Sequence, residues 1–186
     1  MDEKVQVQLG EFETLFKGNI FTVKQRQITY PNGSIQTHEY CQRFDSVTVL
    51  AFDEQNRLLL TREFRESKNK YVWFLPTGKI DDQEDPQTAI VREMREEIGL
   101  RPRTIRLLAK RSAGSSYFLW DTYIFVAKDL EPAPLEQEEY FPIEVVPTEL
   151  AKAVEMAEGG EIENVYLAYN IIWFNYLLKT KKFSWG

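Results

Sequence analysis

Seven carboxylate side chains fall between Gly78 and Leu100, in the stretch GKIDDQEDPQTAIVREMREEIGL. Three of them, Glu93, Glu96 and Glu97, have the spacing that brings side chains to one face of a helix. Like charges on one face repel one another unless a cation or a basic side chain lies among them. Clustered hard oxygen ligands suit Mg²⁺ or Mn²⁺. An ordinary solvated surface helix would also fit, and helical geometry alone does not decide between the two.

The flanking residues predict where this helix begins and ends. Asp85 suits the N-cap and Pro86 the first helical position, while Gly99 suits the left-handed residue that follows a helix. We therefore expect a helix from about Pro86 to Ile98. Its apolar side chains lie on a different arc and should pack against a sheet: Ile90, Val91, Met94 and Ile98.

Neighbouring residues are placed to hold or orient the three glutamates. Arg92 lies beside the carboxylates and would fix their positions by ion pairing. Glu84, just before the N-cap, would reach back across the loop. The turn at residues 75–78 brings backbone close to the helix, so that a carbonyl group there would also face a metal ion.

Length and composition exclude several other kinds of protein. The 186 residues suffice for one domain, or one domain with a small appendage, and the 13% aromatic content supports a packed core. The net charge of −6 argues against general affinity for nucleic acid, and no apolar run approaches the roughly 20 residues of a membrane span. The acidic, polar N-terminus does not resemble a secretory signal, and we expect a cytoplasmic protein.

The chain has one cysteine, Cys41, and one histidine, His38. A single cysteine excludes an internal disulfide and a multi-cysteine zinc site. His38 lies in the alternating stretch GSIQTHEY, which is typical of an exposed hairpin strand. We expect a surface position for it rather than a catalytic one, so the chemistry should depend on carboxylates.

The remaining pattern predicts an α+β fold. Two hairpins are expected, 19–30 with 34–44 around the turn PNG, and 45–53 with 57–64. Further strands are expected over 71–76, 104–111, 116–129 and 141–146, with a turn at Thr77-Gly78, and helices over 147–160 and 161–180. We expect residues 1–42 to form an N-terminal β-hairpin region that serves as a dimerisation arm, and residues 43–186 to form the main domain.

The stretch 78–100 resembles the Nudix box, GX5EX7REUXEEXGU, in which U is a bulky apolar residue. Gly78 opens it, Glu84 follows after five residues, and Arg92-Glu93 come after seven more. The other specified positions are filled by Met94, Glu96, Glu97, Gly99 and Leu100. Every specified position matches, so the chain is identified as a member of the Nudix family.

This resemblance implies an α/β/α sandwich with a mixed central sheet, and hydrolysis of nucleoside diphosphates linked to another group with Mg²⁺ or Mn²⁺ as cofactor. It implies that Glu93 and Glu97 are the principal metal ligands and Glu96 an additional one. The carbonyl of Thr77 corresponds to a position that often completes the metal shell. Two further residues correspond to the ion pair that orients the site: Arg92 and Glu84.

The whole chain is similar to the ADP-ribose pyrophosphatase and nucleoside-diphosphate-sugar hydrolase branch of the family. Hairpins precede the core, FLPTGKID resembles the branch's ELPAGKID, and IEVVPTELAKAVEMAEGGEIEN resembles its C-terminal part. TREFRE resembles its Q-x-R strand end, which makes Arg65 a candidate phosphate contact. Members are usually dimers in which the N-terminal sheet reaches the partner, so the resemblance implies a homodimer.

Three positions depart from that branch. Phe74 replaces the usual acidic residue before Leu-Pro, and Ser116 stands where ADP-ribose members usually carry proline. Phe141 replaces the second glutamate of an E-x-E pair, whose first position fits Glu139. These departures weaken the expectation of ADP-ribose as substrate more than the expectation of hydrolysis.

The general base that activates water is expected in the loop PLEQEEY. Glu139 is the first choice, Glu138 and Glu136 are alternatives in the same loop, and Glu96 on the helix comes next. Arg62 and Arg65 are both candidate substrate contacts, but they should face opposite sides of a strand and not share one phosphate. Five aromatic residues would either fill the core or stack on a nucleobase: Tyr71, Trp73, Tyr117, Phe118 and Trp120.

The leading hypothesis is hydrolysis of the pyrophosphate bond of a nucleoside diphosphate sugar, ADP-ribose or another, to a nucleoside monophosphate and a sugar phosphate. One alternative is a non-catalytic sensor of nucleotide sugars, against which the complete box argues. Another is a hydrolase of a different nucleoside diphosphate derivative, such as a dinucleotide polyphosphate. The sequence leaves the base and the sugar open.

Overall fold

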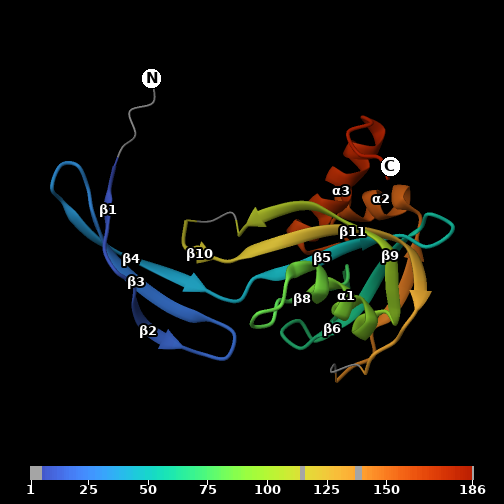
Figure 1. Cartoon of the computed structure of the whole chain (residues 1–186), viewed down its shortest axis with the longest axis horizontal. Coiled ribbons are helices and arrows are strands. Elements are labelled where there is room, and N and C mark those ends of the chain that lie inside the picture. The colour runs from blue at the N-terminus through green and yellow to red at the C-terminus, as the bar shows by residue number, and fades with distance from the viewer. Residues whose placement is uncertain (1–5, 114–115, 137–139, 186) are drawn as a thin grey trace. The chain divides into compact units, whose positions relative to one another are not determined.

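The structure is a computed structural model that describes residues 6–113, 116–136 and 140–185. The chain divides into two compact units, which Figure 1 shows by residue number. The first unit comprises Met1–Asp45 and Arg111–Thr122, and the second comprises Ser46–Lys110 and Tyr123–Gly186. The stretch that resembles the Nudix box therefore lies wholly in the second unit.

The first unit is built on one antiparallel hairpin. Its strands are β1 (Gln8–Leu9), β2 (Glu13–Lys17), β3 (Thr22–Thr29), β4 (Ile35–Gln42) and β10 (Phe118–Leu119). β3 and β4 form the expected hairpin, whose turn is closed by Gly33 at φ +81°. β10 joins β4 in parallel, so a segment far along the sequence completes this sheet.

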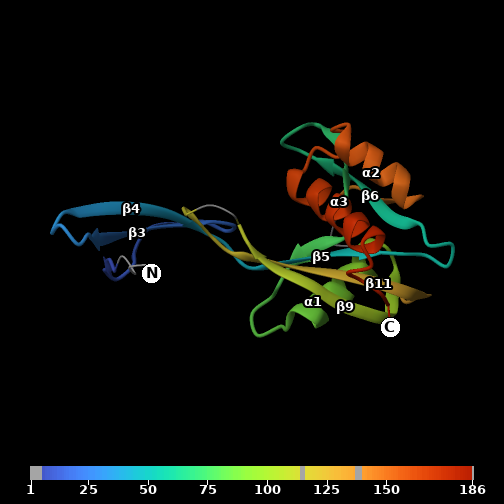
Figure 2. The same cartoon turned by 90° about the horizontal axis from the view of Figure 1, so that it is seen from above.

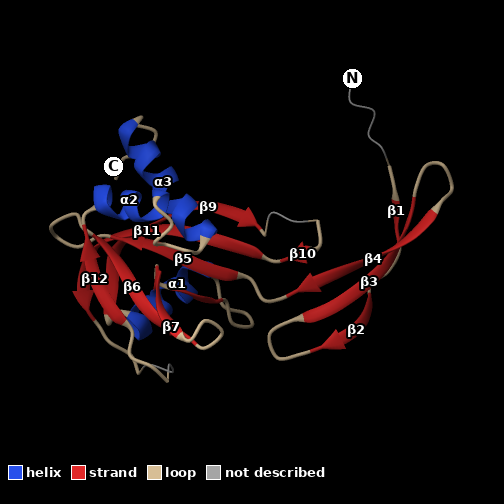
Figure 3. Cartoon of the chain, turned by 180° about the vertical axis from the view of Figure 1, so that it is seen from behind, coloured by secondary structure: helices blue, strands red, loops and turns tan. Residues whose placement is uncertain are grey.

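The second unit contains two sheets and, in its described part, three helices. Its strands are β5 (Ser46–Ala51), β6 (Leu58–Arg65), β7 (Lys70–Phe74), β8 (Thr77–Lys79), β9 (Leu100–Ser112), β11 (Asp121–Pro132) and β12 (Glu144–Thr148), with the ends of β9 and β11 in the first unit. Its helices are α1 (Pro86–Glu97), α2 (Leu150–Glu158) and α3 (Val165–Lys179). One sheet has the order β8-β5-β11-β9, and Figure 3 shows the other, β12-β6-β7.

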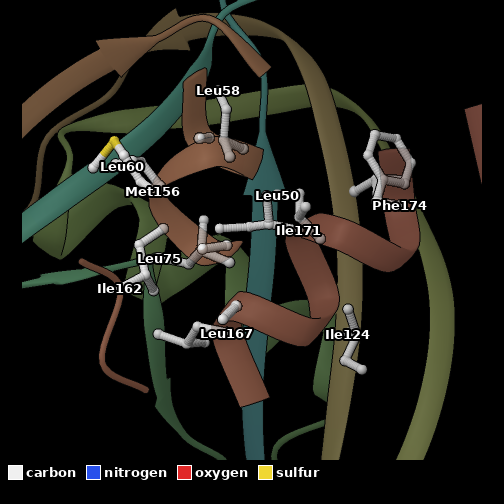
Figure 4. Packing of buried hydrophobic residues seen from close by; sticks show 14 of the residues in the cluster. Leu50, Leu58, Leu60, Leu75, Ile124, Met156, Ile162, Leu167, Ile171 and Phe174 are labelled. Carbon is white, nitrogen blue, oxygen red and sulfur yellow. The ribbon is translucent and has the colours of Figure 1, made fainter. Parts of the chain in front are cut away.

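Alternating residues of β5 divide the core of the second unit into two layers. Val47, Val49 and Ala51 pack in a cluster with Ile90 and Met94 of α1. Leu50 belongs to the other cluster, which contains residues of α2 and α3 (Figure 4). Figure 2 shows α1 on one side of β5 and α2 and α3 on the other. This is the α/β/α sandwich that the sequence predicts.

The expected hairpin of 45–53 with 57–64 is wrong. The turn itself forms, because the Asp53 carboxylate accepts hydrogen bonds from the amides of Gln55 and Arg57. β5 and β6 then diverge into different sheets and share an isolated bridge between Phe52 and Leu58. Both strands are buried. β5 pairs with β8 and β11, whereas β6 pairs with β12 and β7, so the two strands belong to different layers of the sandwich.

Two smaller expectations also fail. Thr77-Gly78 is not a turn but belongs to β8, which pairs with β5 through Thr48 and Val47. The single strand expected over 116–129 is divided at Trp120, because β10 pairs with β4 whereas β11 lies between β5 and β9. Among the described residues, no helix is both long and apolar enough to cross a membrane.

Candidate active site

The helix α1 is fixed at both ends, as its sequence predicts. The Asp85 carboxylate accepts hydrogen bonds from the amides of Gln87 and Thr88, at 3.0 and 3.1 Å, and Pro86 occupies the first turn. Gly99 adopts a φ of +70° directly after the C-cap, where a side chain would be strained. The caps set the rotation of the helix, so Ile90 and Met94 are fully buried while Val91 is only half-buried, less than expected.

Glu93 lies in a space that only a glycine at position 78 permits. A Cβ atom added to Gly78 would stand 1.8 Å from the carboxylate carbon of Glu93. Glu93 is 9% exposed, and burial raises the pKa of its carboxyl group, although Arg92 acts in the opposite direction. The spacing of Gly78 and Glu93 in the sequence thus corresponds to a direct contact between β8 and α1.

Glu97 is buried one turn further along α1. Its Oε2 accepts a hydrogen bond from the backbone amide of Thr77 at 3.0 Å. The Thr77 hydroxyl in turn donates to the carbonyl of Leu75 at 2.8 Å, which fixes the backbone that holds Glu97. The sequence resemblance pointed to the carbonyl of Thr77, and the contact recorded in the structure is made by its amide.

Arg92 joins the carboxylates of the box into one network. Its Nε and Nη2 donate to the two carboxylate oxygens of Glu84, at 3.1 and 3.0 Å. Its Nη1 donates to Glu93 and Glu96, at 2.8 and 2.9 Å. The bidentate pair with Glu84 is the main reason that the pKa of the arginine is raised above its usual value. Nη2 also donates to the carbonyl of Lys79, so Arg92 ties the loop before α1 to the helix.

The three glutamates do not stand together as a ready set of ligands. Over the ranges that the structure describes, no group of three acidic, histidine or cysteine side chains is arranged to hold a metal ion. Arg92 lies between Glu93 and Glu96 and supplies the positive charge there. The residues nevertheless fit a divalent cation, because Glu93 and Glu97 are two buried carboxylates on one helix face.

The two candidate arginines of β6 point to opposite faces, as their positions in the strand predict. Arg62 pairs with Glu144 of β12 at 3.4 Å and lies over the rings of Tyr71 and Trp73. Arg65 pairs with Glu63 at 2.5 Å. Odd-numbered Leu59 belongs to the cluster around α1, whereas Leu58 and Leu60 belong to the cluster of α2 and α3. The strand therefore turns Arg65, and not Arg62, to the side on which α1 packs.

The start of the loop that is expected to carry the general base is attached to α1. Sequence reasoning assigned no role to Arg95. Its Nε donates to the carbonyl of Ala133 at 2.9 Å, and its backbone carbonyl accepts from the amide of Leu135 at 3.0 Å. Glu136, the next residue, is exposed. Glu138 and Glu139 lie outside the described residues. After them, Phe141 packs against Phe64 of β6, with ring centroids 4.4 Å apart.

The other residues considered from sequence are distributed between the two units. His38 bonds to the hydroxyl of Tyr30 across the β3–β4 hairpin, at 3.0 Å, in the first unit. Tyr117, Phe118 and Trp120 belong to the first unit as well, and the last two stack on each other. Tyr71 and Trp73 lie on β7 in the second unit, on the face of Arg62. None of these six residues takes part in the hydrogen bonds described above for the α1 carboxylates.

Comparisons with known proteins agree with this geometry. The family profile of the NUDIX domain matches residues 42–164. An ADP-ribose pyrophosphatase of Bacillus subtilis is 23% identical over 163 residues, which cover 86% of this chain and 87% of the relative. The ADP compounds hydrolase NudE of Escherichia coli is 30% identical over 80% of this chain and 81% of its own. A crystal structure of an ADP compounds hydrolase superposes with a TM-score of 0.82, at 26% identity, and covers 95% of this chain and 96% of that one.

In this α/β/α sandwich, the glycine-containing strand β8 lies against the capped helix α1 and holds its glutamates. This arrangement defines the class of Nudix-type hydrolases. The profile match covers more than half of the sequence, and the chain belongs to the Nudix family. It is a Nudix pyrophosphohydrolase, as the box and the relatives together establish. Nudix hydrolases generally use divalent metal ions. The sequence resemblance to the Nudix family is therefore confirmed.

Proposed function

We propose that this enzyme hydrolyses the pyrophosphate bond of a nucleoside diphosphate sugar, with ADP-ribose as the first candidate, and releases a nucleoside monophosphate and a sugar phosphate. The observation that carries the proposal is the pair of buried carboxylates of Glu93 and Glu97, which are held against β8 by Gly78 and by the Thr77 amide. Two relatives of similar length are named for ADP-ribose or ADP compounds, which supports a diphosphate as the group that is cleaved.

Mg²⁺ or Mn²⁺ is the proposed cofactor. Glu93 and Glu97 would hold it, with Glu96 and the carbonyl of Thr77 as further ligands. A bound divalent ion supplies positive charge that neutralises the charge developing on the phosphate groups. Arg92 and Glu84 keep the glutamate side chains in place before the ion binds, because their network fixes both the loop and the helix. Arg65 is the proposed phosphate contact from β6, and Arg62 the weaker candidate on the other face.

The general base is proposed to come from the loop after Leu135. Its first choice is Glu139, followed by Glu138 and Glu136. Leu135 is attached to Arg95, two residues before Glu97. A base is needed only as water attacks, so Glu139→Gln should lower kcat strongly and leave metal affinity nearly unchanged.

The test is a panel of nucleoside diphosphate sugars and a dinucleotide polyphosphate, each incubated with the protein and Mg²⁺. Phosphate released after coupling to a phosphatase measures hydrolysis, and chromatography of the uncoupled products identifies the bond that is cut. Turnover of a nucleotide sugar to a nucleoside monophosphate is the expected result. Turnover of the dinucleotide polyphosphate alone would favour the second candidate, hydrolysis of another diphosphate derivative, which the relative named for ADP compounds also supports.

We also propose that the protein is a homodimer assembled through the first unit, and that it acts in the cytoplasm. Large apolar side chains of this unit are exposed in the single chain, among them Phe12, Leu15, Phe16, Ile20 and Phe21. Burial of such side chains is the main favourable contribution to protein association. Sedimentation at micromolar concentration tests the proposal, because a monomer would contradict it.

A further inference from the structure

A line of polar contacts runs along β6 on the side that faces the α1 cluster. Glu63 is 7% exposed, and its carboxylate accepts a hydrogen bond from the Thr61 hydroxyl at 2.6 Å. The other carboxylate oxygen accepts from Nη2 of Arg65 at 2.5 Å. A carboxylate is costly to bury unless donors surround it, so these contacts restrict Glu63 to one arrangement.

The Arg65 side chain runs back along the strand from which it projects. Its backbone pairs with Lys70, yet its guanidinium carbon lies 4.3 Å from the ring centroid of Phe74, which pairs with Thr61. The guanidinium is therefore held by an ion pair to Glu63 and by a ring beneath it. A planar group held in both ways has little freedom to rotate.

This direction leads toward the proposed active site. Phe74 stands three residues before Thr77, whose amide holds Glu97. The Arg65 side chain is 39% exposed, so its remaining N–H groups are open to a ligand although one of them is bound to Glu63. An arginine in this state presents a fixed pair of donors, which matches the oxygen atoms of a phosphate.

We propose that Glu63 is a positioning residue, which holds Arg65 over Phe74 so that the guanidinium is already oriented when a substrate phosphate arrives. The gain in affinity comes from ordering the arginine before binding, since an ordered side chain loses less conformational freedom in the complex. The inference rests on the proposed function only in taking the ligand to carry a diphosphate.

A purely electrostatic role makes the opposite prediction. A negative charge beside a phosphate site weakens anion binding, so its removal should strengthen binding. Glu63→Leu and Glu63→Gln remove the same charge. They differ in that the glutamine carbonyl still accepts a hydrogen bond from Arg65, whereas leucine does not. The difference between these two variants therefore measures positioning apart from charge.

The experiment is calorimetric titration of ADP-ribose into the protein in EDTA, so that binding is measured without turnover. We expect Glu63→Leu to bind about tenfold more weakly than the parent, as loss of a charge-assisted hydrogen bond predicts, and Glu63→Gln to stay within about threefold of it. Glu66→Gln, in the exposed turn after β6, is the control for charge and should bind as the parent does. In an Arg65→Ala background, Glu63→Leu should cause no further loss.

Three results would overturn the inference. They are equal affinity of the leucine and glutamine variants, the same loss for Glu63→Leu whether or not Arg65 is present, and no saturable binding of ADP-ribose by the parent. Thermal unfolding of each variant shows whether a loss reflects the fold instead of the contact. Hydrolysis is measured separately with Mg²⁺, so a parent that binds ADP-ribose but does not cleave it would contradict the proposed function and leave the role of Glu63 standing.

Discussion

Helix α1 and the sheet of the first unit depart from the usual distribution of side chains in opposite directions. On α1 two charged residues, Glu93 and Glu97, are buried at 9% and 8% exposure. In the first unit, large apolar residues such as Phe16 of β2 and Ile20 of the β2–β3 connection are 62% and 56% exposed. Charged residues are seldom buried unless they are paired, and apolar side chains exposed together mark interaction sites.

The two departures correspond to the two partners proposed above. Within the chain, Arg92 contacts Glu93 and Glu96, and Glu97 receives a hydrogen bond from the Thr77 amide. A divalent cation would add positive charge beside these buried carboxylates. The N-terminal sheet needs apolar surface instead, which a second copy of the same sheet would supply. The predictions below separate these two partners.

The largest effect is expected from Glu97→Gln. The change keeps the size and helix propensity of the side chain but removes a negative ligand, and it should lower turnover by at least about a hundredfold with the fold intact. Hydrolysis of the preferred nucleotide sugar, with circular dichroism as the check on folding, measures it. A well-folded variant that keeps its activity would remove Glu97 from the site.

Gly78→Ala should be the next most damaging change. The new methyl group would occupy the place of the Glu93 carboxylate, so the glutamate must move or β8 must separate from α1. We expect about a tenfold or greater loss of turnover and a loss of about 1–3 kcal/mol in the free energy of unfolding. If the contact is the cause, Gly78→Ala should have little further effect on turnover in a Glu93→Gln background. Additive losses would instead indicate that Gly78 acts apart from Glu93.

Phe16→Glu tests the exposed apolar residues of the first unit. Phe16 is exposed, so the change should scarcely alter the folding of the chain, but it should raise the dissociation constant of the proposed dimer about tenfold or more, because a charge would enter an apolar interface. Analytical ultracentrifugation measures the constant. Val165→Glu, at an exposed apolar position at the start of α3 in the second unit, is the control and should leave assembly unchanged. Equal behaviour of the two variants would remove the N-terminal sheet from the interface.

The smallest effect is expected at Glu163, a surface carboxylate that pairs with two lysine side chains. Hydrogen bonds from Lys68 and Lys70 lower the pKa of Glu163 to about 2. Because folding lowers this pKa, the carboxylate stabilises the folded state at pH values above its ordinary pKa of about 4.5. This stabilisation disappears as the pH falls toward 2. Glu163→Gln should therefore unfold at a slightly lower temperature than the parent at pH 6 and at the same temperature near pH 2, because exposed pairs contribute little. A difference that grew as the pH fell would contradict this assignment.

Local sequence signals predicted helix α1 well, because its ends follow from the caps and its faces from helical spacing. The caps at Asp85 and Gly99 fix the start and end of α1, and helical spacing then fixes where Glu93 and Glu97 point. The closeness of Gly78 to Glu93 was not visible in this way, since it depends on the pairing of β8 with β5. The spacing within the box was the signal for it, through the family resemblance.

Strand pairing was predicted less well than the helices. The β3–β4 hairpin has a short turn that determines its register, whereas β5 and β6 follow a turn of similar appearance and then separate. Long-range partners decided the outcome there, and they leave no mark in the local pattern. Arg95 and Glu63 were missed for the same reason. Their contacts with Ala133 and Arg65 depend on how the chain folds back, and neither residue stands out in the sequence.

The most direct test of the account is whether the buried carboxylates of α1 bind a divalent cation. Electron paramagnetic resonance can measure free Mn²⁺ during titration of the parent, Glu97→Gln and Glu155→Gln, where Glu155 is an exposed residue of α2. We predict saturable binding by the parent and Glu155→Gln with the same affinity, and binding at least about tenfold weaker by Glu97→Gln. Equal affinity in all three proteins, or no saturable binding by the parent, would contradict the assignment of α1 as the metal site.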